Sequence, residues 1–287
     1  MLTVENLTFS YHRKKAPIFR DFSLSLPQRG VYGLLGENGA GKTTLIYMMM
    51  GLLTPQGGQV KLDGVNVRRR LPETMNKIYL VPEEYDLPPI TLDRYVSLNA
   101  PFYPRFSEDD MKSYLGIFDM ESDINLQELS MGQKKKVLMS FALATHTPLL
   151  LLDEPTNGLD IPSKSQFRKF IAQGMTEDQT ILISTHQVRD VEQILENIII
   201  LDQSRVLLDE PSQRISEKLS FVESRDKELL AKAIYSQPTF NGNALLMPSE
   251  GDEPEDNIDL ELLFNATLNH PERIENIFKA DHKEALS

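Results

Sequence analysis

The chain has 287 residues, 40% of them hydrophobic, a formal net charge of −12 and no cysteine. This length accommodates one large domain with a sizeable core and a smaller addition, and the lack of cysteine excludes disulfides and thiolate metal sites and suits a reducing compartment. The acidic balance disfavours nucleic-acid partners and direct contact with anionic lipid. The sequence shows neither a signal-peptide pattern nor a run of about 18 apolar residues, so we expect a cytoplasmic chain with no direct membrane insertion.

The stretch 36–43, GENGAGKT, lies between the apolar run 31–35 and a helix predicted over Thr43–Leu53. It matches G-x-x-x-x-G-K-[ST], whose glycines can adopt positive φ and let backbone N–H groups turn toward a phosphate at a helix start. The lysine is predicted to reach the β and γ phosphates, and the hydroxyl of Thr43 to bind Mg²⁺. A turn that binds nothing would leave both side chains unexplained. The predicted nucleotide contacts are Gly36, Asn38, Gly39, Ala40, Gly41, Lys42, Thr43 and Thr44.

Strand and helix signals alternate to about residue 201, which predicts an α/β fold with a mostly parallel sheet covered on both faces. The predicted strands are Gln59–Leu62, Ile78–Val81, Leu149–Leu152, Thr180–Ser184 and Asn197–Leu201, and the later helices are Ser163–Gln173 and Gln187–Leu195. A helical subdomain at about residues 84–145 interrupts this alternation. In it, Ser107 and Asp110 form a capping-box pattern ahead of an apolar helix face that comprises Met111, Tyr114, Leu115 and Phe118.

Two acids follow four leucines in LLLLDEP, residues 149–155. The carboxyl edge of a parallel sheet places the first acid, Asp153, beside the phosphate loop, where it can hold Mg²⁺ directly or through water. Glu154 is the predicted general base for a water that attacks the γ phosphate. Acidic strand ends are common in α/β proteins, so this prediction depends on the phosphate loop.

A second helix start suited to phosphate occurs in LSMGQKKK, residues 129–136, where Ser130 and Gly132 offer a hydroxyl and free N–H groups. Taken alone, the pair also fits an ordinary N-cap with a turn glycine. The three lysines 134–136 are predicted to form a solvated helix face.

With these motifs in this order, the sequence resembles the ATP-binding cassette (ABC) family, whose signature is Leu-Ser-Gly-Gly-Gln. Met131 stands at the first glycine, and Gln133 matches the last position. The resemblance covers residues 1–207 and implies a P-loop ABC ATPase domain that binds ATP and Mg²⁺ between two protomers.

The resemblance also assigns three single residues. It implies that Asp160 contacts the opposite protomer, that His186 faces the γ phosphate as a catalytic residue together with Lys42 and Glu154, and that Tyr11 stacks on adenine. A polar loop histidine and a core-packing tyrosine are the alternatives for the last two.

Glu83 stands where the family usually has glutamine, and glutamate can still bind Mg²⁺ or the lytic water. This residue, the segment 102–106 and the segment 258–264 resemble ATPase subunits that export drugs, lantibiotics or polysaccharides. The last part of the chain, 208–287, is predicted to be a small α/β accessory domain that the catalytic part can fold without. It holds an acidic loop at Glu250–Asn257 and two amphipathic helices split by Pro271. A regulatory ligand site there is the alternative.

The resemblance thus implies an ATP-hydrolysing subunit that powers export through a separate integral-membrane permease. The permease would dock at residues 83–106 and hold the subunit peripherally at the cytoplasmic face of the cell membrane. The second ATPase subunit would be an identical copy or an unlike one. One alternative is a soluble ABC ATPase of translation or DNA repair, although such proteins typically duplicate the cassette or carry a long coiled coil. Another is a P-loop small-molecule kinase, which leaves Leu129–Gln133 and His186 unexplained.

Overall fold

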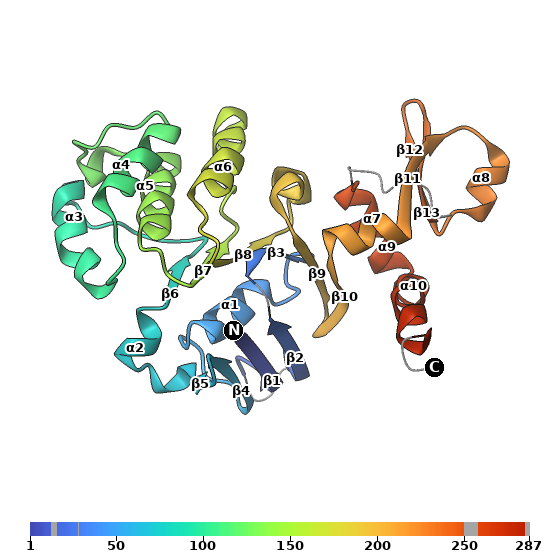
Figure 1. Ribbon diagram of the computed structural model, residues 1–287, viewed down its shortest axis with the longest axis horizontal. Coiled ribbons are helices and arrows are strands. Elements are labelled where there is room, and N and C mark those ends of the chain that lie inside the picture. Colours follow the sequence, from blue (N-terminus) through green and yellow to red (C-terminus); the bar gives the residue numbers. More distant parts are fainter. Residues whose placement is uncertain (13–15, 28, 250–257, 285–287) are drawn as a thin grey trace.

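The computed structural model describes residues 1–12, 16–27, 29–249 and 258–284. A six-stranded sheet of order β10-β9-β3-β8-β7-β6 runs through the larger part of the chain, residues 1–211 (Figure 1). Five of its strands run parallel, and β10 pairs antiparallel with β9 at one edge. The strands are β3 (Gly30–Leu35), β6 (Ile78–Val81), β7 (Leu149–Asp153), β8 (Thr180–Thr185), β9 (Asn197–Asp202) and β10 (Arg205–Pro211). The predicted mostly parallel sheet is confirmed.

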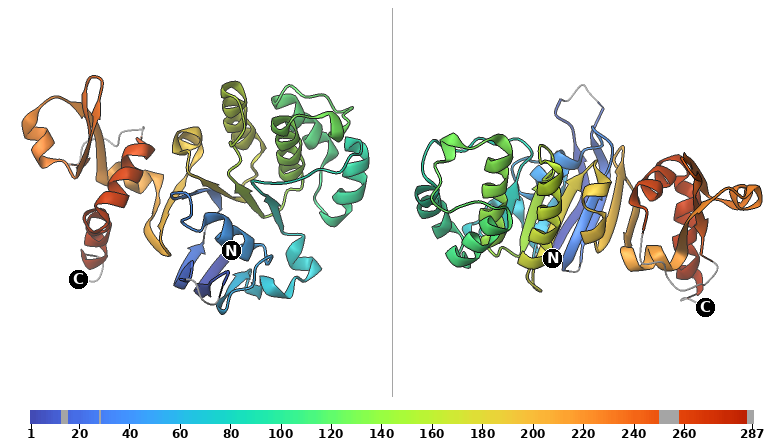
Figure 2. Two further views of the ribbon diagram at one scale, coloured as in Figure 1. Left: turned by 180° about the vertical axis from the view of Figure 1, so that it is seen from behind. Right: turned by 90° about the horizontal axis from the view of Figure 1, so that it is seen from above.

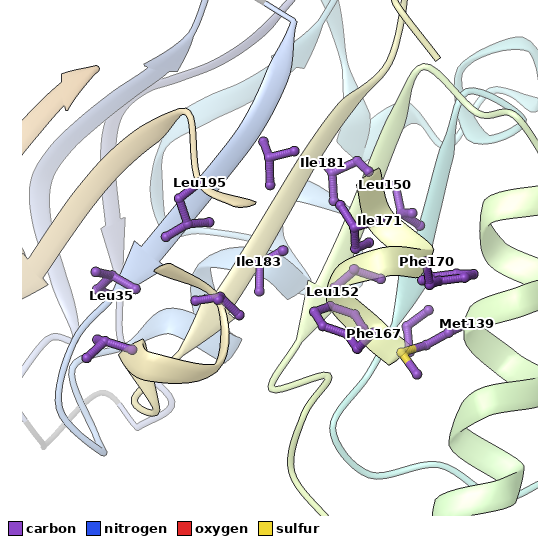
Figure 3. Close-up of a cluster of buried hydrophobic side chains, with 14 of the residues drawn as sticks. Leu35, Met139, Leu150, Leu152, Phe167, Phe170, Ile171, Ile181, Ile183 and Leu195 are labelled. Carbon is purple, nitrogen blue, oxygen red and sulfur yellow. The ribbon is translucent and has the colours of Figure 1, made fainter. Parts of the chain in front are cut away.

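The central strands are buried on both faces because their apolar side chains alternate between two cores. Val31 and Leu35 of β3 pack in one core, with α5 (Met131–Ala144) and α6 (Ile161–Gly174). Tyr32 and Leu34 point into the other, toward α1 (Lys42–Met49). Figure 3 shows the first core, where Phe167 and Phe170 of α6 lie over strands β7 and β8.

A second sheet covers the α1 face. Its order is β2-β1-β4-β5, and its paired strands are antiparallel. The strands are β1 (Leu2–Phe9), β2 (Phe19–Leu26), β4 (Gly57–Leu62) and β5 (Val65–Asn66). We predicted a strand near β4 but no separate antiparallel sheet. The face of the large sheet that carries α1 is thus covered by a second sheet as well as by a helix.

The helical subdomain lies on one side of the large sheet, as Figure 2 shows. It follows the short α2 (Pro72–Met75) and contains α3 (Leu92–Asn99), α4 (Glu108–Ile117) and α5. The predicted cap of α4 is present, because the Ser107 hydroxyl accepts the Asp110 N–H at 3.2 Å. Its predicted apolar face is buried as well.

The predicted helix at Gln187–Leu195 was wrong. The segment forms two 3₁₀ turns, Val188–Asp190 and Glu192–Ile194. Val188 and Val191 are buried three residues apart, and this spacing satisfies a 3₁₀ turn as well as an α-helix. The 3₁₀ turn Val188–Asp190, called the 188–190 turn below, is separated from the end of β8 by His186 and Gln187.

The C-terminal part forms a three-stranded antiparallel sheet, β11-β13-β12, with helices beside it (Figure 1). The elements are α7 (Ser212–Lys218), β11 (Leu219–Ser224), α8 (Lys227–Lys232), β12 (Tyr235–Thr239), β13 (Gly242–Pro248), α9 (Leu260–Asn269) and α10 (Pro271–Glu284). The two helices split by Pro271 are as predicted, whereas the predicted acidic loop at Glu250–Asn257 lies outside the described residues. None of the described helices is both long and apolar enough to cross a bilayer.

Two observations bear on the predicted division of the chain. The boundary after residue 207 falls inside β10, which pairs with β9 as far as Pro211. In addition, Leu260, Leu263 and Ala266 of α9 are buried in the same core as α5 and α6. A boundary after Pro211 keeps β10 whole within the large sheet. Because α9 shares a core with α5 and α6, its removal is expected to destabilise the part of the chain before that boundary.

Candidate functional site

The phosphate loop connects β3 to α1, as its sequence predicts. Gly39 and Gly41 have φ of +87° and +103°, so these two positions use the left-handed freedom of glycine. Gly36 does not. A Cβ there would lie 2.6 Å from the carbonyl oxygen of Leu201, so close backbone approach requires this glycine. Asn38 and Gly39 are exposed at the rim of the loop, while Ala40 and Thr44 are buried.

Lys42 begins α1 and is buried, with a side-chain exposure of 6%. Its Nζ donates to the carbonyl oxygens of Gly36 at 2.7 Å and Glu37 at 3.2 Å, and lies 3.6 Å from Oε1 of Glu154. Burial lowers the pKa of Lys42, and the charge of Glu154 opposes this shift. The lysine therefore sits between the loop and the acids that follow β7.

Asp153 ends β7 and is fully buried. Ser184 on the neighbouring strand β8 donates to Oδ1 at 2.5 Å, while Oδ2 has no hydrogen-bond partner among the described residues. Burial raises the pKa of this carboxyl, and the hydroxyls of Ser184 and Thr43 oppose the rise. A buried carboxylate oxygen without a donor, near a hydroxyl, fits a hard cation such as Mg²⁺, which takes few protein ligands and keeps water or phosphate as the others. Within the described ranges, no group of three or more His, Cys, Asp or Glu residues is placed so that it could hold a metal ion.

Glu154 adopts a left-handed backbone conformation, with φ of +46°, at the turn after β7. Its N–H donates to the carbonyl oxygen of Ser184 at 3.0 Å, and its Oε1 lies 2.8 Å from Nδ1 of His186. The same carboxylate oxygen, Oε1, therefore faces both the His186 ring and the Lys42 ammonium. The parallel pairing of β7 with β8 brings the two strand ends together and joins these residues, which are far apart in sequence.

Glu83 follows β6 and is exposed. Its Oε1 accepts from Nδ2 of Asn157 at 2.8 Å, and Oδ1 of Asn157 accepts from Nε2 of Gln187 at 2.7 Å. The charge of Glu83 also acts on Asp153 and Lys42. Glu83, a predicted metal residue, therefore lies near Asp153, although its own hydrogen bond is to the side-chain amide of Asn157.

Lys135 contradicts the predicted solvated face of 134–136. It is 3% exposed, and its Nζ donates to the carbonyl oxygens of Glu154 at 2.9 Å and Asn157 at 3.0 Å. Sequence reasoning missed Lys135, Ser184 and Gln187. For Lys135 a signal exists, since it stands three, four and seven residues before the buried Leu138, Met139 and Ala142 and so shares their face of the helix.

Tyr11 lies beside the phosphate loop. Its hydroxyl is 3.1 Å from Oγ1 of Thr44, and its ring packs edge-on against Phe9 while 54% of the residue stays exposed. A partly exposed ring can stack on a base.

The remaining predicted residues form a second group around the start of α5. Ser130 caps this helix and shares a capping box with Gln133, and a Cβ on Gly132 would lie 3.4 Å from the carbonyl oxygen of Gly158. Asp160 caps α6 by accepting the Ser163 N–H at 3.0 Å. Ser130, Gln133 and Asp160 are exposed, and so is Met131 at 68%. The N–H of Gln133 donates to the Ser130 hydroxyl at 3.3 Å, whereas the first two N–H groups of α5 have no carbonyl partner within the helix. The start of α5 is therefore an exposed helix terminus of the kind that favours an anion.

A family model described as ABC transporter matches residues 19–157. The chain is 31% identical over 221 residues to the ABC transporter ATP-binding protein NatA of Bacillus subtilis, covering 72% of this chain and 88% of NatA. The chain belongs to the ABC transporter ATP-binding proteins. Its catalytic part is an ABC ATPase.

Two further relatives carry names of opposite direction. The chain is 30% identical to the Nod factor export ATP-binding protein I of Cupriavidus pinatubonensis, over 66% of this chain and 60% of the relative. It is also 30% identical to the methionine import ATP-binding protein MetN of Carboxydothermus hydrogenoformans, over 72% and 65%. The chain thus spans about two thirds or less of these two proteins.

Solved structures support the same fold. The structure of an ATP-binding subunit of an ABC transporter matches with a TM-score of 0.66 and 25% identity, over 75% of this chain and 91% of that chain. The ABC ATPase fold predicted from the motifs is confirmed.

Proposed function

We propose that this ABC ATPase binds Mg-ATP between two protomers and hydrolyses it to power export through a separate membrane permease. The buried group of Lys42, Asp153, Glu154 and the adjoining His186 carries the proposal. It combines a lysine for phosphate, an unpartnered carboxylate oxygen and a carboxylate poised beside a histidine.

In this proposal Glu154 is the general base. The His186 Nδ1 contact at 2.8 Å and the backbone anchor to Ser184 fix the direction of its carboxylate, so that it can take a proton from a water beside the γ phosphate. Lys42 lies within reach of both that carboxylate and the loop, where it offsets phosphate charge. Asp153 and Thr43, with Glu83 nearby, would hold Mg²⁺, which neutralises charge on the transferring phosphoryl group.

Two protomers are proposed because the phosphate loop and the start of α5 make separate sets of contacts within one chain. Ser130, Gly132, Gln133 and Asp160 would face the nucleotide held by the phosphate loop of a second subunit, and Tyr11 would stack on its adenine. The exposure of Ser130, Gln133 and Asp160 at the starts of two helices supports this arrangement, because a helix start favours an anion.

A membrane permease is proposed to dock on the helical subdomain between residues 83 and 106. Leu98 and Phe102 there are 48% and 69% exposed, and exposed apolar side chains are typical of contact surfaces. Docking at that surface would hold the subunit at the cytoplasmic face of the membrane. Export is favoured by Glu83 and the segments 102–106 and 258–264, which resemble export-type subunits.

The test is co-purification from detergent-solubilised membranes of the source cell, with the co-purifying integral-membrane protein identified. Phe102→Ser is expected to lose this protein, whereas Phe240→Ser, a control at a fully exposed phenylalanine in the C-terminal hairpin, should retain it. If both variants retain the membrane protein, the proposed docking surface is wrong. For direction, cells that lack the chain should become sensitive to a toxic compound. A nutritional defect in these cells would instead indicate import.

A further inference from the structure

The 188–190 turn joins the catalytic group to the C-terminal part of the chain. It begins two residues after His186, whose N–H and ring both contact Glu154. The N–H of Gln187 donates to the hydroxyl of Thr185 at 2.9 Å. A displacement of this turn therefore acts on the histidine through two peptide units.

On one side, α6 holds the turn. Nζ of Lys164 lies 2.7 Å from Oδ2 of Asp190 and donates to Oε1 of Gln187 at 3.0 Å. Arg168 donates to the carbonyl oxygen of Asp190 at 3.5 Å. These contacts all come from within the catalytic part of the chain.

On the other side, the turn meets α9 of the C-terminal part. Arg189 forms an ion pair with Glu261 in the first turn of that helix. Between the two elements lies an open cavity of about 530 Å³, which His186 lines on one side and Phe264 and Asn265 on the other. The ion pair is a charged contact between α9 and the turn beside this cavity.

We propose that Arg189 and Glu261 are positioning residues for His186, through which α9 sets the geometry of the Glu154–His186 pair. The inference rests on the proposed function of that pair in ATP hydrolysis. Leu260 and Leu263 anchor α9 in the core, so its first turn is a fixed support, whereas the turn it holds is only three residues long. A partner or ligand that shifts α9 would change turnover by this route.

Charge reversal tests the link. Glu261→Arg places like charges in contact, and Arg189→Glu does the same with the opposite sign. Each single variant should lower kcat about two- to fivefold, as expected for a half-exposed pair, with KM for ATP within about twofold of wild type. The double variant restores the pair and should recover most of kcat. A role limited to packing would not produce recovery by reversal.

Hydrogen–deuterium exchange of the segment 186–191 gives a readout that does not depend on turnover. Exchange there should rise in each single reversal and return in the double variant. Lys279→Glu is the control, because its partner Glu275 lies on the exposed face of α10, and it should change neither readout. Unchanged kcat and unchanged exchange in both single variants would overturn the positioning role. If the single reversals raise exchange in this segment but the wild-type chain has no ATPase activity, the link between α9 and the turn is supported and the proposed function is wrong.

Discussion

The buried lysine of α5 offers a quantitative test of how the catalytic loop is held. Lys135→Met keeps the length and volume of the side chain and removes both hydrogen bonds, to the carbonyl oxygens of Glu154 and Asn157. The first of these belongs to a residue with a left-handed backbone, a conformation that costs about 1–3 kcal/mol and persists only when its surroundings hold it.

The expected loss follows from the two contacts. Leaving a buried acceptor unpaired costs about 1–3 kcal/mol, and the second acceptor is only partly buried. Burial lowers the pKa of Lys135, so its replacement also relieves some desolvation. We therefore expect a net loss of about 2–4 kcal/mol. In a domain of this size that corresponds to a fall in Tm of roughly 4–16 °C.

The assay is thermal and urea unfolding, with ATPase activity measured below the transition. Lys134→Met is the matched control, because the Lys134 side chain is only half-buried and lies on another part of the helix surface. Lys135→Met should also lower kcat, since the backbone that aims Glu154 is loosened. Equal Tm and equal kcat in the two variants would refute the account of this loop.

Three further predictions concern the acids and the C-terminal part. Glu154→Gln should bind ATP but hydrolyse it at least about a hundredfold more slowly, because general-base help is worth about 10²–10⁴; near-normal turnover would remove Glu154 from that role. Burial raises the pKa of Asp153, so its ionisation destabilises the fold as pH rises from the unfolded-state pKa through the higher folded-state pKa. Asp153→Asn should accordingly raise Tm at pH 7 without Mg²⁺. The variant should also lose the rise in Tm that Mg-ATP gives the wild type. A Mg-ATP response equal to that of the wild type would exclude Asp153 as the metal residue. Truncation after Pro211 should lower Tm or cause aggregation, because it uncovers the core that α9 seals; a truncated chain as stable as the full one would show the C-terminal part to be separable.

Much of the catalytic group could be predicted from sequence because each part is a local pattern. The glycine loop, the acids after a leucine strand and the histidine after a second strand all stand at ends of buried parallel strands. Parallel pairing places such ends along one edge of a sheet. That rule is enough to bring Asp153 near Lys42 without knowledge of the pairing register, whereas the place of His186 was implied only by the resemblance to the ABC family.

The partners of these residues could not be predicted in the same way. Ser184 reaches Asp153, and Gln187 reaches Asn157, only through the register of β7 with β8 and the course of the loops after them. Sequence gives neither. The 3₁₀ turns in Gln187–Leu195 cannot be told from a helix by sequence, because valines three residues apart fit both periods. The antiparallel layer of β1 and β2 does not follow from the alternation of strand and helix signals, which predicts only the parallel sheet.

The central claim is that two protomers build each nucleotide site, and mixing two inactive variants tests it most directly. Lys42→Ala removes a phosphate ligand, and Ser130→Arg blocks the start of α5 with a bulky cation. In a mixed dimer one composite site receives an intact phosphate loop from one protomer and an intact α5 start from the other. The account predicts that ATP-dependent dimer, measured by light scattering, returns in the mixture although each variant alone stays monomeric. No recovery under conditions where subunit exchange is shown independently would contradict a site shared between identical chains.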